Sequence, residues 1–131
     1  MGTSLYSTAT RARALTPEER ERVGALVERY RDGLVDRIED AFPGRGRELV
    51  REYCEPFGWY SDDALAPGEI LDGAVKISHT QAPWEVMAAQ VEHWLALLGE
   101  VRAAVPGAEW QVHLDGVHAG WDPEAGCFSL P

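Results

Sequence analysis

Hydrophobic residues recur at helical spacing in the first third of the chain. The sequence T-P-E-E at residues 16–19 is typical of a helix start, because Thr16 suits the N-cap, Pro17 suits the first helical position and Glu19 completes a capping box. Pro43-Gly44 would end the helix. We therefore predict a helix over residues 17–42 whose apolar face is formed by Val23, Leu26, Val27, Tyr30, Leu34, Ile38 and Ala41.

A second long periodic segment follows Pro83 and ends before Pro106-Gly107. Two ridges of apolar residues run along it, which predicts a helix over residues 83–105 that packs on two sides. Shorter apolar patterns predict helices at about 45–54 and 68–77. Residues 1–15 show no clear period, and we interpret them as a polar lead-in to a single domain over residues 16–131.

The segment W-Q-V-H-L-D-G-V-H-A-G-W, residues 110–121, predicts a β-hairpin around Asp115-Gly116. This register pairs His113 with His118 on a polar face and places apolar residues on the other. A second turn at residues 122–126 would pair Trp121 with Phe128. The predicted fold class is α+β, with three to four N-terminal helices followed by a C-terminal three-stranded antiparallel meander packed on the 83–105 helix.

Charge is distributed unevenly along the chain, which has a net charge of −10. Residues 1–60 hold 10 arginines and 11 acidic residues, whereas residues 61–131 hold Lys76 and Arg102 against 11 acidic residues. Such a surface disfavours direct binding to nucleic acid or an anionic membrane and favours a basic protein partner. The alternative is that the acidic residues serve solubility alone.

Length and cysteine content fit a single cytoplasmic domain. The 131 residues suffice for one core, and Cys54 and Cys127 are the two cysteines, which argues for reduced thiols rather than a disulfide framework. The first residues resemble no secretory signal, and no apolar run approaches the length that spans a bilayer.

Aromatic and acidic residues crowd together after Pro56. Trp59 and Tyr60 precede Asp62 and Asp63, and further acidic residues follow at Glu69 and Asp72. Aromatic residues beside charges are typical of protein interfaces, so we predict that these six residues bind a partner. The competing interpretation is that the aromatic residues fill the core beneath an irregular connection.

Motifs for known chemistries do not occur in the sequence: it has no glycine-rich phosphate loop, no H-E-x-x-H, no G-x-S-x-G and no C-x-x-C. We therefore expect no cofactor and no metal, with His113 and His118 a weak candidate pair because a tight site needs three or four ligands. Cys54 is interpreted as a buried structural thiol. If the protein is an enzyme, His79 and His93 are the candidate acid–base residues.

These patterns together favour a small acidic intracellular binding protein. The specific form we expect is an immunity protein or antitoxin that neutralises a cationic, nuclease-like toxin. Two alternatives stay open: a small cofactor-free enzyme or ligand-binding domain with a pocket lined by histidine and carboxylate groups, and a regulatory subunit of another protein.

Overall fold

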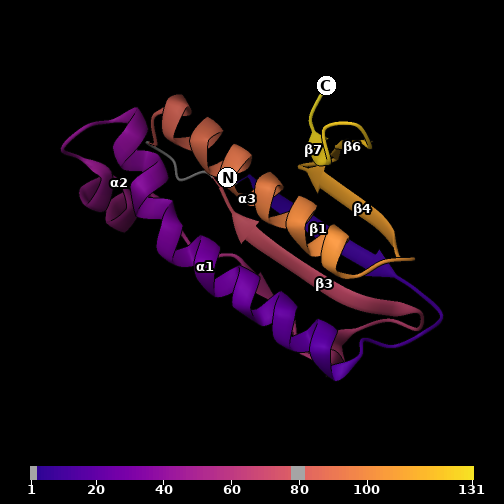
Figure 1. Cartoon of the computed structure of the whole chain (residues 1–131). Coiled ribbons are helices and arrows are strands. Elements are labelled where there is room, and N and C mark those ends of the chain that lie inside the picture. Colours follow the sequence, from indigo (N-terminus) through magenta and orange to yellow (C-terminus); the bar gives the residue numbers. More distant parts are fainter. Residues whose placement is uncertain (1–2, 78–81) are drawn as a thin grey trace.

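The computed structural model describes residues 3–77 and 82–131 (Figure 1). It is a mixed α+β structure in which three α-helices accompany a five-stranded antiparallel sheet and a separate two-stranded hairpin. In chain order the elements are β1 (Ser4–Thr10), α1 (Pro17–Ala41), α2 (Gly46–Tyr53), β2 (Gly58–Trp59), the 3₁₀ helix η1 (Asp62–Ala64), β3 (Glu69–Lys76), α3 (Trp84–Ala104), β4 (Glu109–Leu114), β5 (Val117–His118), β6 (Gly120–Asp122) and β7 (Cys127–Ser129).

The main sheet has the strand order β2-β3-β1-β4-β5, and every neighbouring pair is antiparallel. With α2 as an addition, β1-α1-β2-β3-α3-β4 is the connectivity of a split β-α-β, or ferredoxin-like, arrangement. Both edges of the sheet are strands of only two residues, β2 and β5. The most N-terminal strand, β1, lies at the centre and pairs with β3 on one side and β4 on the other.

The polar lead-in predicted for residues 1–15 is therefore wrong for β1. Leu5, Ser7 and Ala9 alternate inward and are fully buried, while Tyr6 on the opposite face is exposed. Two of the three inward residues are small or polar, so the strand shows little hydrophobic alternation. Its burial comes from pairing with strands far away in the sequence.

The helix predicted at 68–77 is also wrong, because these residues form β3. A short apolar run fits a buried strand as well as a helix, and periodicity alone does not distinguish them. Leu71, Val75 and Ile77 point to the buried face of the sheet, where Gly73 also lies.

The predicted helices at 17–42, 45–54 and 83–105 are confirmed as α1, α2 and α3. The Thr16–Glu19 capping box is present at the start of α1, and α1 runs unbroken through Gly33. Figure 1 shows α1 and α3 side by side across one face of the sheet, which places the core between them and the strands. Its largest fully buried side chains include Trp94, Phe57, Leu5, Leu26, Ile38, Leu49, Ile77, Leu97 and Leu98.

Arg11 fastens the loop between β1 and α1. Its guanidinium lies 2.7 Å from a Glu19 carboxylate oxygen and also donates to the carbonyl of Pro106, in the loop after α3. Both charged side chains are nearly buried. This contact lowers the pKa of Glu19 to about 2, because the Arg11 hydrogen bond and then the Thr16 backbone N–H stabilise the carboxylate.

The hairpin around Asp115-Gly116 is confirmed, with His113 opposite His118 and both turn residues at positive φ. The three-stranded meander is wrong in its topology. β4 joins the main sheet through β1, whereas β6 and β7 form a separate two-stranded hairpin in the described part of the chain, with Trp121 opposite Phe128 as predicted. The chain leaves the sheet after β5 and carries Trp121 onto α3, where the Arg102 guanidinium stacks 4.2 Å from the Trp121 ring centroid.

Candidate functional site

A cleft of about 390 Å³ lies between the N-terminal part of α1 and the segment that runs from β2 to β3. We call it the aromatic–acidic cleft. It is lined by Leu15, Arg20, Val23, Gly24, Trp59, Tyr60, Ser61, Asp62, Leu65, Ile70, Leu71 and Asp72. Four of the six residues predicted to bind a partner, Trp59, Tyr60, Asp62 and Asp72, therefore meet in one place.

The aromatic residues of this segment divide between the core and the surface. Phe57 is fully buried and makes an edge-on contact with Trp59, at 4.8 Å between ring centroids. Trp59 is half-buried and lies across Gly73 of β3, whereas Tyr60 is 48% exposed. The core interpretation thus holds for Phe57, and Tyr60 is available for contact with another molecule.

The carboxylates of the cleft are only partly satisfied by protein groups. Asp62 forms an exposed ion pair with Arg20 at 3.1 Å, and Asp72 accepts a 3.3 Å hydrogen bond from the Thr8 hydroxyl. Asp63 and Glu69 do not line the cleft; Asp63 lies in η1, and Glu69 accepts a hydrogen bond from the backbone N–H of Ala66. Arg20, Leu65 and Ile70 are lining residues that the sequence analysis missed.

Local pairing with the arginines of α1 neutralises a minority of the acidic residues after position 60. Ion pairs join Asp62 to Arg20, Glu100 to Arg29 and Glu92 to Arg37. Of the 11 acidic residues in the second half, the other eight carry no ion pair to any described residue. The anionic surplus of this half therefore stays available to a partner.

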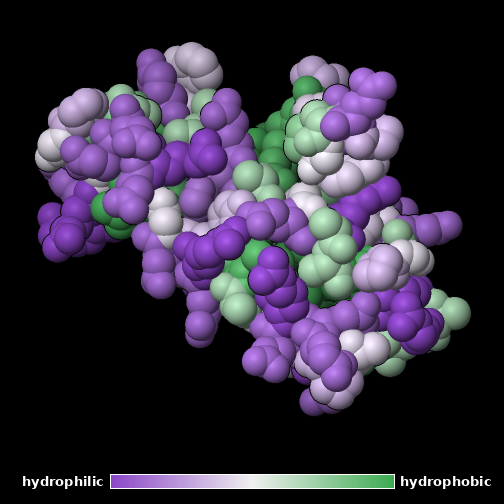
Figure 2. All heavy atoms as spheres, in the orientation of Figure 1, coloured by the Kyte–Doolittle hydropathy of each residue, from purple (hydrophilic) through white to green (hydrophobic). Residues whose placement is uncertain are grey.

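A larger cleft, which the sequence analysis did not predict, follows the N-terminal half of α3. We call this volume of about 620 Å³ the apolar cleft. Its lining is almost entirely hydrophobic and consists of Thr3, Ile77, Trp84, Met87, Ala88, Val91, Glu92, Leu95, Ala96, Leu114, Cys127, Phe128, Ser129 and Leu130. Figure 2 shows hydrophobic atoms in the hollow between α3 and the C-terminal hairpin.

The apolar cleft exists because the hairpin of β6 and β7 covers only the C-terminal half of α3. The hairpin approaches α3 closely at Gly99, where an added Cβ would lie 3.1 Å from the carbonyl oxygen of Gly126. Two helical turns or more before this point the apolar side of α3 is less covered: Val91 and Met87 are only partly buried, and Trp84 at the start of α3 is 68% exposed. The two apolar ridges of α3 were visible in the sequence. The length of α3 that the hairpin covers was not.

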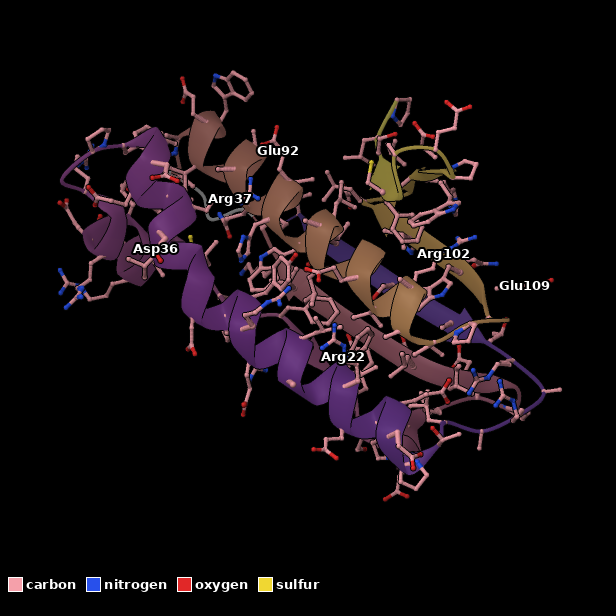
Figure 3. All side chains as sticks on the ribbon, in the orientation of Figure 1. Arg22, Asp36, Arg37, Glu92, Arg102 and Glu109 are labelled. Atoms are coloured by element: carbon pink, nitrogen blue, oxygen red, sulfur yellow. The ribbon has the colours of Figure 1, made fainter. Side chains whose placement is uncertain are left out.

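A third, more polar cleft of about 570 Å³ separates α1 from α3 and contains His93. The Arg37 Nε donates to His93 Nδ1 at 3.0 Å, and His93 Nε2 lies 2.6 Å from the Tyr30 carbonyl oxygen, to which it donates. The Tyr30 hydroxyl in turn donates to the Glu100 carboxylate. Arg37 and Glu92 extend toward one another across the cleft (Figure 3), with 3.8 Å between their charged atoms.

Both ring nitrogens of His93 are thus held by protein groups, as expected of a hydrogen-bonded buried histidine. Burial lowers the pKa of His93, and the Arg37 charge lowers it further, while the hydrogen bond to Tyr30 acts in the opposite direction. Burial and the Arg37 charge both favour the neutral imidazole, whose unprotonated Nδ1 accepts the Arg37 hydrogen bond. The acid–base role considered for it stays a prediction, and His79, the other candidate, lies outside the described residues.

The remaining candidates show no assembled chemistry. His113 and His118 face each other with 5.5 Å between ring centroids, and Tyr6 stacks on His113. Within residues 3–77 and 82–131, no group of three or more His, Cys, Asp or Glu side chains is placed to hold a metal ion. Burial raises the pKa of the Cys54 thiol to about 11, which fits a structural rather than a nucleophilic cysteine.

No α-helix in the described part of the chain is long and apolar enough to cross a membrane. No protein-family model matches the sequence, and no curated protein matches it. Among solved structures, a similar one is the solution structure of a hypothetical protein from Arabidopsis thaliana. It is 18% identical, the match covers 86% of each chain, and the TM-score is 0.34.

Proposed function

We propose that this protein binds a basic protein partner through the aromatic–acidic cleft, as an immunity protein or antitoxin does when it neutralises a cationic, nuclease-like toxin. The observation that carries the proposal is the meeting of Trp59, Tyr60, Asp62 and Asp72 at one cleft. An exposed aromatic ring beside incompletely paired carboxylates suits an arginine or lysine side chain, whose stem packs on apolar groups while its charge meets the acids.

Affinity and association rate would come from different parts of the molecule. The eight acidic residues without an ion pair to a described residue create a long-range field that speeds encounter with a cation. Tyr60, 48% exposed before binding, would lose water on contact and contribute to slow dissociation. The cleft volume of about 390 Å³ is sufficient for one long side chain of the partner.

The test is capture of the partner by the tagged protein in its native host, followed by identification and reconstitution from purified components. We expect one basic protein, recovered in stoichiometric amount, whose association rate falls steeply as salt rises. The double variant Asp62→Asn/Asp72→Asn should lose most of the binding, and Tyr60→Ala should weaken it at least fivefold.

The matched control is Glu85→Gln/Glu124→Gln, which removes the same two charges from exposed positions outside the cleft. If both double variants weaken binding equally, net charge and not the cleft governs recognition. A partner that is toxic when expressed alone and harmless beside this protein supports the immunity role. An enzyme whose activity the protein changes supports the regulatory alternative, and an acidic partner contradicts the proposal.

A further inference from the structure

The apolar cleft along α3 is independent of the site discussed above. It shares no lining residue with the aromatic–acidic cleft. Its volume of about 620 Å³ lies in the range of small-molecule sites, which are also mostly apolar with a few polar groups. The cleft therefore has the size and lining of a site for a small organic molecule.

The walls of the cleft suit a flexible apolar ligand. Leu95 and Phe128 are buried, whereas Met87 and Val91 are only partly covered. A methionine adapts its shape to different occupants, because its side chain is unbranched and its sulfur is polarizable. At the start of α3, Trp84 is 68% exposed, and the face of an indole ring attracts cations.

The charge at the apolar cleft determines which charged group a bound apolar ligand can carry. Among the described lining residues, Glu92 is the one with a formal charge, and its side chain is 74% exposed. Its nearest described cation, an Arg37 nitrogen, lies 3.8 Å away, and Arg37 already donates its Nε–H to His93. The cleft thus keeps a partly neutralised negative charge within a chain of net charge −10, which repels carboxylates and attracts ammonium groups.

We propose that the apolar cleft binds a small organic amine, with its hydrocarbon body against Met87, Val91 and Leu95 and its ammonium group at Glu92. The proposal follows from a groove whose described lining carries one charged group, the Glu92 carboxylate, about two helical turns from the exposed Trp84. It does not depend on the basic protein partner.

Three probes of equal length test the proposal: octylamine, octanol and octanoate, measured by titration calorimetry and by tryptophan fluorescence. We expect octylamine to bind most tightly and octanoate least. Glu92→Gln should weaken octylamine about two- to fivefold, the range of one exposed ion pair, and leave octanol unchanged. Ala88→Trp, which fills the cleft from α3, should weaken all binding at least tenfold.

Ala103→Trp is the matched control, because Ala103 is an exposed alanine of the same helix that does not line the cleft. Urea unfolding of each variant shows whether it is folded, and Ala88→Leu replaces Ala88→Trp if the larger side chain prevents folding. Equal affinity for the three probes, or an equal loss of all three in Glu92→Gln, overturns the assignment of an amine. Binding that survives both Ala88 variants overturns the cleft as the site. Absence of probe binding, together with a dimer that Ala88→Trp dissociates, would show that a second copy of the chain occupies the groove.

Discussion

Substitution of Gly73 by alanine tests the close packing that positions the aromatic–acidic cleft. Gly73 in β3 pairs with Trp59 in β2. A Cβ at this position would lie 2.6 Å from Trp59 Cε3 and 2.7 Å from the carbonyl oxygen of Gly58. It would also lie 3.0 Å from Phe57 Cζ, and Phe57 is fully buried. Relief of these contacts requires the backbone of β2 to move away from β3.

The expected cost follows from two opposing effects. Overpacking of a close-packed site costs about 1–3 kcal/mol, whereas alanine restricts the unfolded chain more than glycine and returns about 0.5–1 kcal/mol. The backbone of Gly73 is not left-handed, so the substitution adds no strain of that kind. We expect a net loss of about 1–2 kcal/mol in the free energy of unfolding.

Urea unfolding, followed by the fluorescence of the five tryptophans, measures this loss. With a slope of about 2 kcal/mol per molar urea, the midpoint should fall by about 0.5–1 M. Gly120→Ala is the matched control, because Gly120 also lies in a strand and its added Cβ would meet nothing within 4 Å. Because the effect of alanine on the unfolded chain applies here without a clash, Gly120→Ala should leave stability unchanged or raise it by up to about 1 kcal/mol. Equal midpoints for the two variants would refute the steric reasoning, and partner binding that is unimpaired in Gly73→Ala would refute the link to the cleft.

Three further predictions concern helix α1 and its contacts. Gly24→Ala should stabilise the protein by about 0.5–1 kcal/mol in the same urea assay, because Gly24 is an exposed helical residue whose added Cβ would meet nothing within 4 Å. A loss of stability would contradict this prediction. His93 binds a proton more readily in the unfolded chain than in the folded one, so the stability of the wild type should fall relative to that of His93→Gln as pH drops below about 6.5. If the urea midpoints of the two proteins change in parallel from pH 8 to pH 5, this effect is excluded. The ionised Glu19 carboxylate stabilises the fold fully above its ordinary pKa of 4.5, and this contribution is lost as pH falls toward about 2. The difference in unfolding free energy between wild type and Glu19→Gln should therefore shrink as pH is lowered through this range. A difference that stays constant would argue against the Arg11 contact.

Local signals in the sequence predict those parts of the fold that local interactions determine. The capping box at Thr16 fixes the start of α1, and Asp115-Gly116 fixes the register of β4 and β5. β1 and β3 are different. Their inward residues include Ser7 and Gly73, whose burial depends on pairing between strands about 65 residues apart, and no local period reports that pairing.

The two clefts also differ in how far local sequence determines them. The proximity of Trp59 and Tyr60 to Asp62 is visible in the sequence, so their meeting in a cleft was predictable. The apolar cleft depends on where the C-terminal hairpin stops along α3. Hydrophobic periodicity shows that a helix face is apolar, and it does not show whether another element covers the whole of that face.

The central position of β1 has a consequence for synthesis of the chain. Ala9 of β1 pairs with Trp110 of β4, so about 100 further residues must be synthesised before β1 can pair on that side. At roughly 5–20 residues per second, the delay is about 5–20 s, far longer than the time in which helices form. In a ribosome-bound chain, α1 and α2 are therefore synthesised several seconds before β4 is available to complete the middle of the sheet.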